Sequence, residues 1–370
     1  KNFIYFMKEF YFLIIGFILG LAFYPLIKNY LLNKITDKFT DNKKVQQDIL
    51  KEIYKSNKEN NILTIDILHK KINIPISNLL KILSKLISLN YVYLSDNDIR
   101  LTNKGKEEAK DIINKHRLLE SYLFEKTSTK LKDIHKIADK KEHLFNEEQI
   151  GIIKNELSNP CIDPHGDILD ENILDENITS FSKVITLGYC QENEIYIVKH
   201  IEDEPAEIYE HLVNLDLAPF DKIKIIKINK DYISIINDKG KKIDIVHFYA
   251  NNVFVSKMEK NEKLQNYFDF LLNHEIITLD KLKLRNPGLI IGLSFYIRGI
   301  QRQRLMELGF IKGNVVIPMY NNSISDDPRA YKIKNSIISL RTEQASKIYV
   351  LDLLSLNNIN QEKIKELINV

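Results

Sequence analysis

Apolar and polar residues follow different patterns in successive stretches of the chain. An uncharged apolar stretch runs from Phe10 to Ile27. Between residues 36 and 178, apolar positions recur every three or four residues, which predicts amphipathic helices. From residue 179 to 258 they alternate with polar positions, which predicts short strands separated by turns. The pattern therefore predicts a helical part followed by a β-rich part.

The apolar stretch Phe10–Ile27 is long enough to cross a bilayer as a helix, at the lower end of the required length. Lysines follow it from Lys28 onward, and the positive-inside rule then places the rest of the chain in the cytoplasm. A cleaved signal peptide is the alternative, but the run is long for one and no small-x-small cleavage site follows it. We predict an uncleaved single-pass anchor in the inner (cytoplasmic) membrane, with the domains in the cytoplasm.

The next stretch, residues 36–108, predicts a winged helix-turn-helix. Thr64 is the expected N-cap of a short helix, and Pro75 opens a longer amphipathic helix. Two short apolar segments around a polar turn at residues 95–98 predict the wing. In such a fold the longer helix enters the major groove of double-stranded DNA. The residues expected to contact DNA are Ser77, Asn78, Lys81 and Lys85.

This interpretation of the longer helix has two alternatives. Lys81 and Lys85 also suit a helix face that is simply solvated, and some winged helices make only protein contacts. The longer helix contains no arginine, so bidentate recognition of guanine by arginine is excluded there.

Histidine and acidic residues recur at helical spacing between His116 and His143. Residues four apart lie on one face of a helix, so two stripes of metal-ligand side chains are expected. Imidazoles and carboxylates without sulfur suit Mn²⁺, Fe²⁺ or Zn²⁺. Ordinary polar positions on amphipathic helices are the alternative, but the coherent spacing of several donors favours a metal site. The candidate ligands are His116, Glu120, His135, Asp139, Glu142 and His143.

The β-rich part predicts two small barrels that repeat one plan. In the first, five alternating segments surround a short helix at residues 207–219. The second barrel follows a helical linker, LQNYFDFLL. Two barrels of similar length in one chain predict an internal repeat.

Composition agrees with a folded protein of several domains. The chain has 370 residues, 44% of them hydrophobic and 28% charged, and a net charge of +3. This near-balance of charge does not decide whether nucleic acid is a partner. The two cysteines, Cys161 and Cys190, form no CxxC pattern, so no disulfide framework or cysteine zinc site is expected.

The segments LTNKGKEEAK, HRLLE, IHKIADKKEH and NPCIDPHGDIL resemble the diphtheria-toxin-repressor family of iron- and manganese-dependent repressors. The resemblance implies a homodimer that binds operator DNA, with a helical dimerisation and metal domain after the winged helix. It implies an ancillary metal site and an effector site. His116, Glu120 and His135 match the ancillary site, and the effector-site ligands are Asp48, Asp139, Glu142 and His143.

The segment QRQRLMELGFIKG resembles FeoA, a module associated with ferrous iron uptake and its transporter. The first barrel also resembles such a module. In iron-type repressors this module lends ancillary ligands from the loop before its helix, which implies Glu202 and Asp203 here. Cys161 and His165 lie in a loop segment of the family that is not expected to supply effector ligands.

The implied ligand set is a hybrid of the two family types. Asp48 and Asp139 replace the methionine and cysteine of iron-type members, as in manganese-type members. His135 is instead an iron-type feature, and Lys51 stands where manganese-type members carry a carboxylate. The expected cofactor is therefore Fe²⁺ or Mn²⁺.

Together these observations predict an α+β multidomain protein that is not an enzyme, because no nucleophile–base pair calls for catalysis. We expect a membrane-tethered, metal-dependent dimeric transcriptional regulator of metal-uptake genes, in which a metal that bonds both the DNA-binding and dimerisation units selects the DNA-competent arrangement. The alternative is a membrane-bound metal-sensing adaptor that regulates a ferrous iron transporter without binding DNA. A metal-dependent hydrolase is a more distant alternative.

The predicted domains are a membrane anchor (1–35), a winged helix (36–108), a helical dimerisation and metal domain (109–178), an SH3-like FeoA-like module (179–258) and a second FeoA-like module with a tail (259–370).

Overall fold

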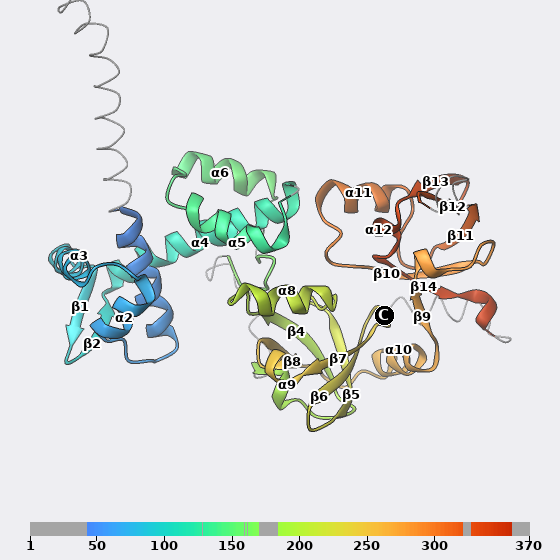
Figure 1. The fold of residues 1–370 in the computed structure, drawn as a ribbon, viewed down its shortest axis with the longest axis horizontal. Coiled ribbons are helices and arrows are strands. Elements are labelled where there is room, and N and C mark those ends of the chain that lie inside the picture. Colours follow the sequence, from blue (N-terminus) through green and yellow to red (C-terminus); the bar gives the residue numbers. More distant parts are fainter. Residues whose placement is uncertain are drawn as a thin grey trace, which may run out of the picture. The chain divides into compact units, whose positions relative to one another are not determined.

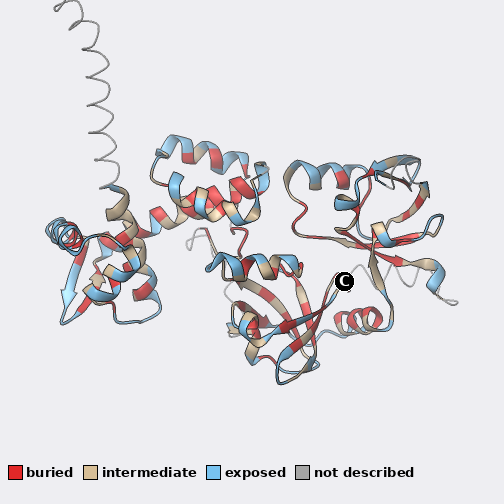
Figure 2. Ribbon diagram, in the orientation of Figure 1, coloured by how far each residue is buried: buried red, intermediate tan, exposed pale blue. Residues whose placement is uncertain are grey.

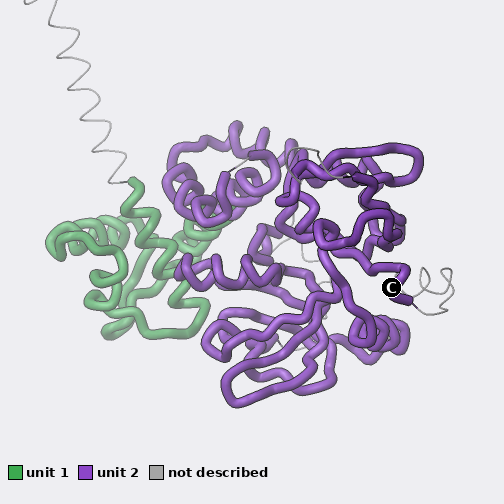
Figure 3. The backbone as a smooth tube through the Cα atoms, turned by 45° about the vertical axis from the view of Figure 1, so that its right-hand side comes forward, with its two compact units in different colours: residues 1–114 green, residues 115–370 purple. Residues whose placement is uncertain are grey.

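The computed structural model describes residues 43–127, 129–158, 160, 162–169, 184–320 and 327–356. The chain divides into two compact units, residues 1–114 and residues 115–370 (Figure 3). Figure 1 labels their helices and strands. The finer division into five domains stays a prediction.

The first unit has the element order of a winged helix-turn-helix. A helix over residues 43–58 precedes α2 (Ile65–Ile72), α3 (Ile76–Ser88), β1 (Val92–Ser95) and β2 (Asp98–Leu101). The side chain of Thr64 caps α2 by accepting a hydrogen bond from Ile67 N at 3.3 Å, as its position predicted. Strands β1 and β2 pair antiparallel and form the wing. The buried core draws on all three helices and the hairpin, including Ile53, Leu68, Leu79 and Ile99.

The second unit begins with helices. Helix α4 (Asn103–Lys126) crosses the boundary between the units, and α5 (Leu131–Lys141) and α6 (Glu147–Glu156) follow it. Helix α6 starts with a capping box between Asn146 and Gln149. A buried apolar cluster holds α4, α5 and α6 together through residues such as Leu119, Ile134 and Ile153.

Two six-stranded antiparallel sheets follow, and they share one topology. The first contains β3 (Val184–Thr186), β4 (Ile195–Ile201), β5 (Lys222–Ile228), β6 (Tyr232–Asn237), β7 (Lys242–Val246) and β8 (Val253–Lys257), in the order β3-β8-β4-β5-β6-β7. The second contains β9 (Ile276–Thr278), β10 (Gly288–Leu293), β11 (Val315–Tyr320), β12 (Arg329–Ile333), β13 (Ser336–Leu340) and β14 (Ile348–Asp352), in the order β9-β14-β10-β11-β12-β13. Because the strands occupy matching places in both orders, the chain contains an internal repeat.

Short helices occupy matching positions in the two β-modules. The first module contains α8 (Ala206–Asn214) and α9 (His247–Ala250), and the second contains α11 (Gly299–Glu307) and α12 (Thr342–Ala345). Each also has a one-turn 3₁₀ segment after its first strand, at Leu187–Tyr189 and Leu279–Lys281. The linker between the modules forms the predicted helix, α10 (Glu262–Asn273).

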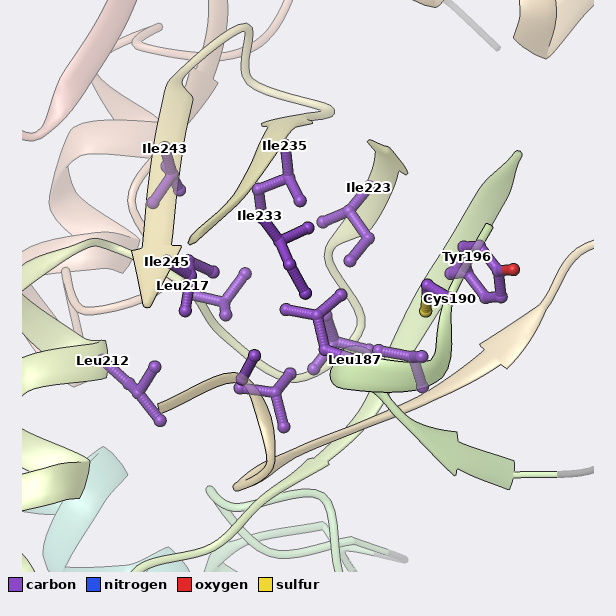
Figure 4. Close-up of a cluster of buried hydrophobic side chains, with 14 of the residues drawn as sticks. Leu187, Cys190, Tyr196, Leu212, Leu217, Ile223, Ile233, Ile235, Ile243 and Ile245 are labelled. Atoms are coloured by element: carbon purple, nitrogen blue, oxygen red, sulfur yellow. The ribbon is translucent and has the colours of Figure 1, made fainter. Parts of the chain in front are cut away.

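Alternation of side chains explains how each sheet buries one set of residues. Strand β7 alternates strictly between exposed and buried residues (Figure 2). In the first module the inward residues, among them Tyr196, Ile223, Ile235 and Ile245, form one apolar cluster (Figure 4). The second module has an equivalent cluster of its own.

The predicted anchor, Phe10–Ile27, lies outside the described residues. Within the described ranges, no helix combines the length and the apolar character needed to cross a membrane. Helix α4 has 24 residues but carries charges such as Lys104, Glu107 and Asp111, which are costly in lipid. The predicted fold class was therefore wrong to include a transmembrane helix. The predicted inner-membrane location depended on that helix and was likewise wrong, and the described residues give no support to a membrane partner.

Candidate metal centre

Helix α4 places two candidate ligands one helical turn apart on its buried face. The side chain of Glu120 is 2% exposed, and His116 Nε2 lies 3.0 Å from Glu120 Oε1. The other ring nitrogen of His116, Nδ1, lies in a short contact with Glu142 Oε2. His116 therefore has one nitrogen directed to Glu120 and the other directed to Glu142.

Helix α5 brings His135 to the same place. His135 Nδ1 lies 2.9 Å from Glu120 Oε1 and 3.2 Å from His116 Nε2. The two imidazole rings are 4.8 Å apart and meet edge to face. The three side chains predicted for an ancillary site, His116, Glu120 and His135, thus converge on one point.

The loop after β4 adds a carboxylate from the first β-module. Asp203 Oδ2 lies 2.8 Å from His135 Nδ1, and Glu204 Oε1 lies 3.3 Å from His135 Nε2. Glu202 lies outside this cluster, with Oε2 3.8 Å from His200 Nε2. Of the two residues predicted from this loop, the structure brings only Asp203 to the cluster.

The Asp163-Pro-His-Gly loop supplies a further imidazole, that of His165, which was not among the predicted ligands. His165 is buried, and its Nε2 lies 3.8 Å from both Glu120 Oε1 and Asp203 Oδ2. Neither ring nitrogen has a hydrogen-bond partner among the described residues. The Asp-Pro-His-Gly motif was the available signal, but helical spacing cannot detect a ligand that comes from a loop.

Backbone contacts hold this loop against strand β4. Ile201 N donates to His165 O at 3.0 Å. Gly166 has φ +98°, and a Cβ on it would lie 1.9 Å from Lys199 O, so only glycine permits this approach. Arg117 of α4 also binds the loop, through Ile168 O at 2.7 Å and Asp167 at 2.8 Å. His165 and Asp203 are therefore positioned by the same strand and by α4.

The electrostatics of the cluster are those of a cation site. Burial favours a neutral Glu120, but His116 and the other imidazoles outweigh it and lower the pKa of Glu120. Burial likewise opposes the charged form of His135, yet hydrogen bonds to Asp203, Glu120 and Glu204 raise its pKa to about 12. Burial opposes the charged form of Asp203 too, but a hydrogen bond to His135 and the nearby His165 lower the pKa of Asp203 to about 2. The carboxylates are thus ionised and stabilise positive charge among them, which in the metal-free chain is the protonated imidazole of His135.

The spacing of these atoms fits one divalent ion. Neighbouring ligand atoms around an octahedral ion, each about 2.1 Å from it, lie about 3.0 Å apart. Glu120, His165 and Asp203 form one group in which all ligand atoms lie within 4.8 Å of one another, and His116, Glu120 and His135 form another. The two unsatisfied ring nitrogens of His165 support the fit, because a buried imidazole without hydrogen bonds is costly and a metal bound to one nitrogen would offset part of that cost.

A second group forms beside the first. The ligand atoms of His116, Asp139 and Glu142 also lie within 4.8 Å of one another, and His143 Nε2 lies 3.4 Å from Glu142 Oε1. Asp139, Glu142 and His143 are residues predicted for the effector site. Asp48, the fourth, lies in the first unit on the helix of residues 43–58.

The residues predicted for DNA contact lie on one element of the first unit. All four belong to α3 and are exposed, while Leu79, Ile82, Leu83 and Leu86 of the same helix are buried. The exposed set is Ser77, Asn78, Lys81 and Lys85.

Comparisons with known proteins agree with this geometry. Residues 102–169 match the family model described as iron-dependent repressor, metal binding and dimerisation domain. Residues 277–351 match the FeoA domain. These two matches cover the helices of the metal centre and the second β-module.

Three individual proteins are similar to parts of the chain. An uncharacterised HTH-type transcriptional regulator of Methanocaldococcus jannaschii is 38% identical over 111 residues, which are 29% of this chain and 88% of that protein. A probable metal transport system membrane protein of Chlamydia trachomatis is 32% identical over 74 residues, 20% of this chain. The chain spans only 16% of the length of that chlamydial protein.

The third is a solved structure, a manganese-dependent transcriptional repressor in complex with manganese. It aligns with a TM-score of 0.51 and 21% identity, over 57% of this chain and 99% of the repressor. At this identity the likeness supports the fold alone. The two family matches and the archaeal regulator carry the assignment: the chain belongs to the diphtheria-toxin-repressor family of metal-dependent transcriptional regulators and carries a FeoA domain.

Proposed function

We propose that this chain is a metal-dependent repressor that binds Fe²⁺ or Mn²⁺, dimerises, and controls metal-uptake genes by binding operator DNA. The observation that carries the proposal is the convergence of Glu120, His135, His165 and Asp203 from four separate segments. The predicted cofactor class, Fe²⁺ or Mn²⁺, is that of the family. The family's members are transcriptional repressors, and this confirms the prediction that the chain is not an enzyme.

We propose a first metal site made from Glu120, His135, His165 and Asp203, with His116 Nε2 as a further donor. Hard carboxylate oxygens and imidazole nitrogens without thiolate favour Fe²⁺ or Mn²⁺ over soft ions. When His116 Nε2 binds the metal, Nδ1–H donates to Glu142, which fixes the tautomer and orientation of the ring. His116 then links this site to the neighbouring carboxylates.

We propose a second site from Asp139, Glu142 and His143. The resemblance adds Asp48 as its fourth ligand, and that assignment stays a prediction. Because Glu142 contacts His116, filling the first site changes the hydrogen bonding of a ligand of the second. The two sites are therefore expected to bind metal interdependently.

The DNA-binding part of the proposal rests on α3. Its exposed face carries two lysines for phosphate contacts and Asn78, whose amide suits adenine. Helix α4 begins directly after the wing strand β2 and carries His116 and Glu120, so metal binding acts on the helix that follows the winged helix. The adaptor alternative and its transporter partner have no support beyond the FeoA match.

Binding of DNA with and without metal tests this function. Duplexes enriched from a random pool in the presence of Mn²⁺ are labelled, and affinity is followed by fluorescence anisotropy with Mn²⁺, with Fe²⁺ under anaerobic conditions, and with chelator. We expect binding by the wild type only with metal, and weaker metal activation for Asp203→Ala. Equal binding with metal and with chelator contradicts the proposal.

A further inference from the structure

A short segment of the second β-module, residues 294–299, touches both parts of the chain that supply the first metal site. It connects β10 to α11 and has the sequence SFYIRG. Ser294, Tyr296 and Ile297 are buried within it. We call it the bracing segment, and it lies more than 90 residues from the nearest proposed ligand in the sequence.

On one side the bracing segment binds the end of α4 and the connection to α5. Arg298 Nη2 donates to Thr129 O at 2.5 Å, and its guanidinium lies 5.1 Å from the ring centre of Phe124. The ring of Phe295 lies 5.2 Å from the same Phe124 ring. This is the hairpin whose two helices carry His116, Glu120 and His135.

The close approach on this side depends on a glycine. Gly299 has φ +49°, and a Cβ at this position would lie 2.1 Å from Glu125 O. Any other residue would push the second module away from the hairpin. The close packing of the bracing segment against Glu125 therefore requires glycine at position 299.

On the other side the bracing segment binds the first β-module. The Ser294 hydroxyl donates a short hydrogen bond to Asp216, and Tyr296 OH donates to Leu217 O at 2.7 Å. Tyr349, from β14 of the second module, donates to Asp216 Oδ2 at 2.7 Å. Asp216 follows α8, the helix that begins directly after the loop carrying Asp203.

These buried hydrogen bonds select one docking geometry. The Asp216 carboxylate is 7% exposed, so a shift that broke its bonds would leave a buried charge without partners. Tyr296 also packs in the apolar cluster that joins Leu118 and Leu119 of α4 to Ala218 of the first module. The segment thus fixes the hairpin and the first module in one relative position.

We propose that the bracing segment is a positioning element for the first metal site: it sets the distance between the hairpin donors Glu120 and His135 and the first-module donor Asp203. The inference rests on the proposed function, because it concerns metal affinity at that site. Metal affinity falls when donors are held loosely, since binding must then order them. The second FeoA-like module thereby gains a role within this chain, in addition to any partner of its own.

Mn²⁺ affinity of the full chain tests the proposal, followed by the electron paramagnetic resonance signal of free Mn²⁺ well below the unfolding temperature. Loss of outer contacts around a metal site typically weakens affinity about tenfold or more, and we expect this for Arg298→Ala and for Ser294→Ala. Arg298→Lys keeps a donor and a positive charge, so it should recover much of the affinity. Arg304→Ala removes an exposed arginine of α11 and should bind as the wild type does.

Two further variants separate the possible failures. Ile333→Val shortens a core side chain in the second module's own apolar cluster, which includes no residue of α4, α5 or the first module, so it reports general destabilisation. If it weakens Mn²⁺ binding as much as Arg298→Ala, the positioning role is wrong. If Asp203→Ala weakens binding while Arg298→Ala and Ser294→Ala do not, the inference fails and the proposed site stands. If Asp203→Ala binds Mn²⁺ normally, the proposed site fails and the inference fails with it.

Discussion

At the scale of single residues, His165 combines burial with a lack of hydrogen bonds. Neither of its ring nitrogens is satisfied within the described part of the chain, although Glu120 and Asp203 face it at 3.8 Å. An unsatisfied buried polar group lowers stability by about 1–3 kcal/mol. A metal ion bound to the imidazole would supply the missing partner, and this accounts for a buried histidine without hydrogen bonds.

The substitution His165→Leu tests this interpretation, because leucine fills much of the space without a nitrogen to satisfy. We expect the metal-free variant to be at least as stable as the metal-free wild type. Its rise in melting temperature with Mn²⁺ should be much smaller, because ligand stabilisation follows affinity. His274→Leu is the matched control, because His274 lies outside the cluster and its Nδ1–H donates to Phe270 O at 2.8 Å. A wild-type Mn²⁺ response in His165→Leu would exclude His165 as a ligand.

Cys190 is also buried, but here burial suppresses the reactivity of the side chain. It is 7% exposed in the core of the first β-module, beside Tyr196 (Figure 4). Burial raises the pKa of its thiol to about 12, although a hydrogen bond with Tyr196 opposes the shift. The nucleophilic thiolate is therefore scarce at neutral pH. This agrees with a structural role.

Alkylation with iodoacetamide at pH 8 checks the prediction for Cys190 in a Cys161→Ser background. We expect the native protein to react far more slowly than the urea-unfolded protein, because burial in the native state raises the pKa of the thiol and shields it from the reagent. Equal rates at pH 8 in the native and unfolded states would show that the thiol is accessible and ionised.

At the scale of elements, the Asp-Pro-His-Gly loop is held in place by a glycine. Gly166→Ala would place a methyl group 1.9 Å from Lys199 O at φ +98°. We expect the free energy of unfolding to fall by roughly 1–3 kcal/mol from backbone strain alone. Metal binding should also weaken, because His165 would move. Urea unfolding measures the first effect and Mn²⁺ titration the second.

Gly151 offers a matched control for that substitution. It lies inside α6, and a Cβ added there meets nothing within 4 Å. Gly151→Ala should therefore stabilise the protein by about 0.5–1 kcal/mol, because alanine favours a helix more than glycine does. If both alanine variants behave alike, the contact with Lys199 is not the cause.

Helix α3 carries a prediction for DNA binding. Lys81→Ala removes an exposed charge from the proposed DNA-contacting face. The slope of log affinity against log salt should fall by about 1, and affinity should weaken similarly for all sequences. Lys332→Ala removes an exposed lysine from β12 and should leave both values unchanged. An unchanged slope for Lys81→Ala would mean that this lysine is only solvated.

Elements with regular periodicity were predictable, and loop contacts were not. The three- and four-residue spacing led to the helices that carry His116, Glu120 and His135, and alternation led to the strands. The apolar run at Phe10–Ile27 led us to predict a transmembrane helix, and no such helix occurs among the described residues. Hydropathy alone is therefore not sufficient to assign a fold class. His165 escaped prediction because its neighbours Glu120 and Asp203 are far from it in sequence and no spacing rule connects them.

At the scale of the whole molecule, the bracing segment was also beyond sequence reasoning. Arg298 and Thr129 are 169 residues apart, so neither residue signals the other. The internal repeat was predicted, but its consequence for the metal site was not. That consequence arises from long-range packing within the second unit, which no local sequence pattern encodes.

The second unit is also joined by α10, which packs between the two sheets. Its apolar side chains, including Phe268 and Leu271, share one buried cluster with Ile236 of β6 and Ile291 of β10. Each sheet thus covers part of the same helix. A cavity made in α10 should therefore weaken both modules, whereas a cavity inside one module's own core should weaken that module first.

Hydrogen exchange of backbone amides distinguishes these two cases. Phe268 is fully buried, and Phe268→Ala should cost about 3–5 kcal/mol. We expect faster exchange in β6 and in β10, because both strands lose contacts with α10. Phe310→Ala removes a buried ring from the second module's own cluster, and it should accelerate exchange in β10 more than in β6. If Phe268→Ala affects only one sheet, the modules are energetically independent, and the second module cannot brace the metal site through a shared rigid body.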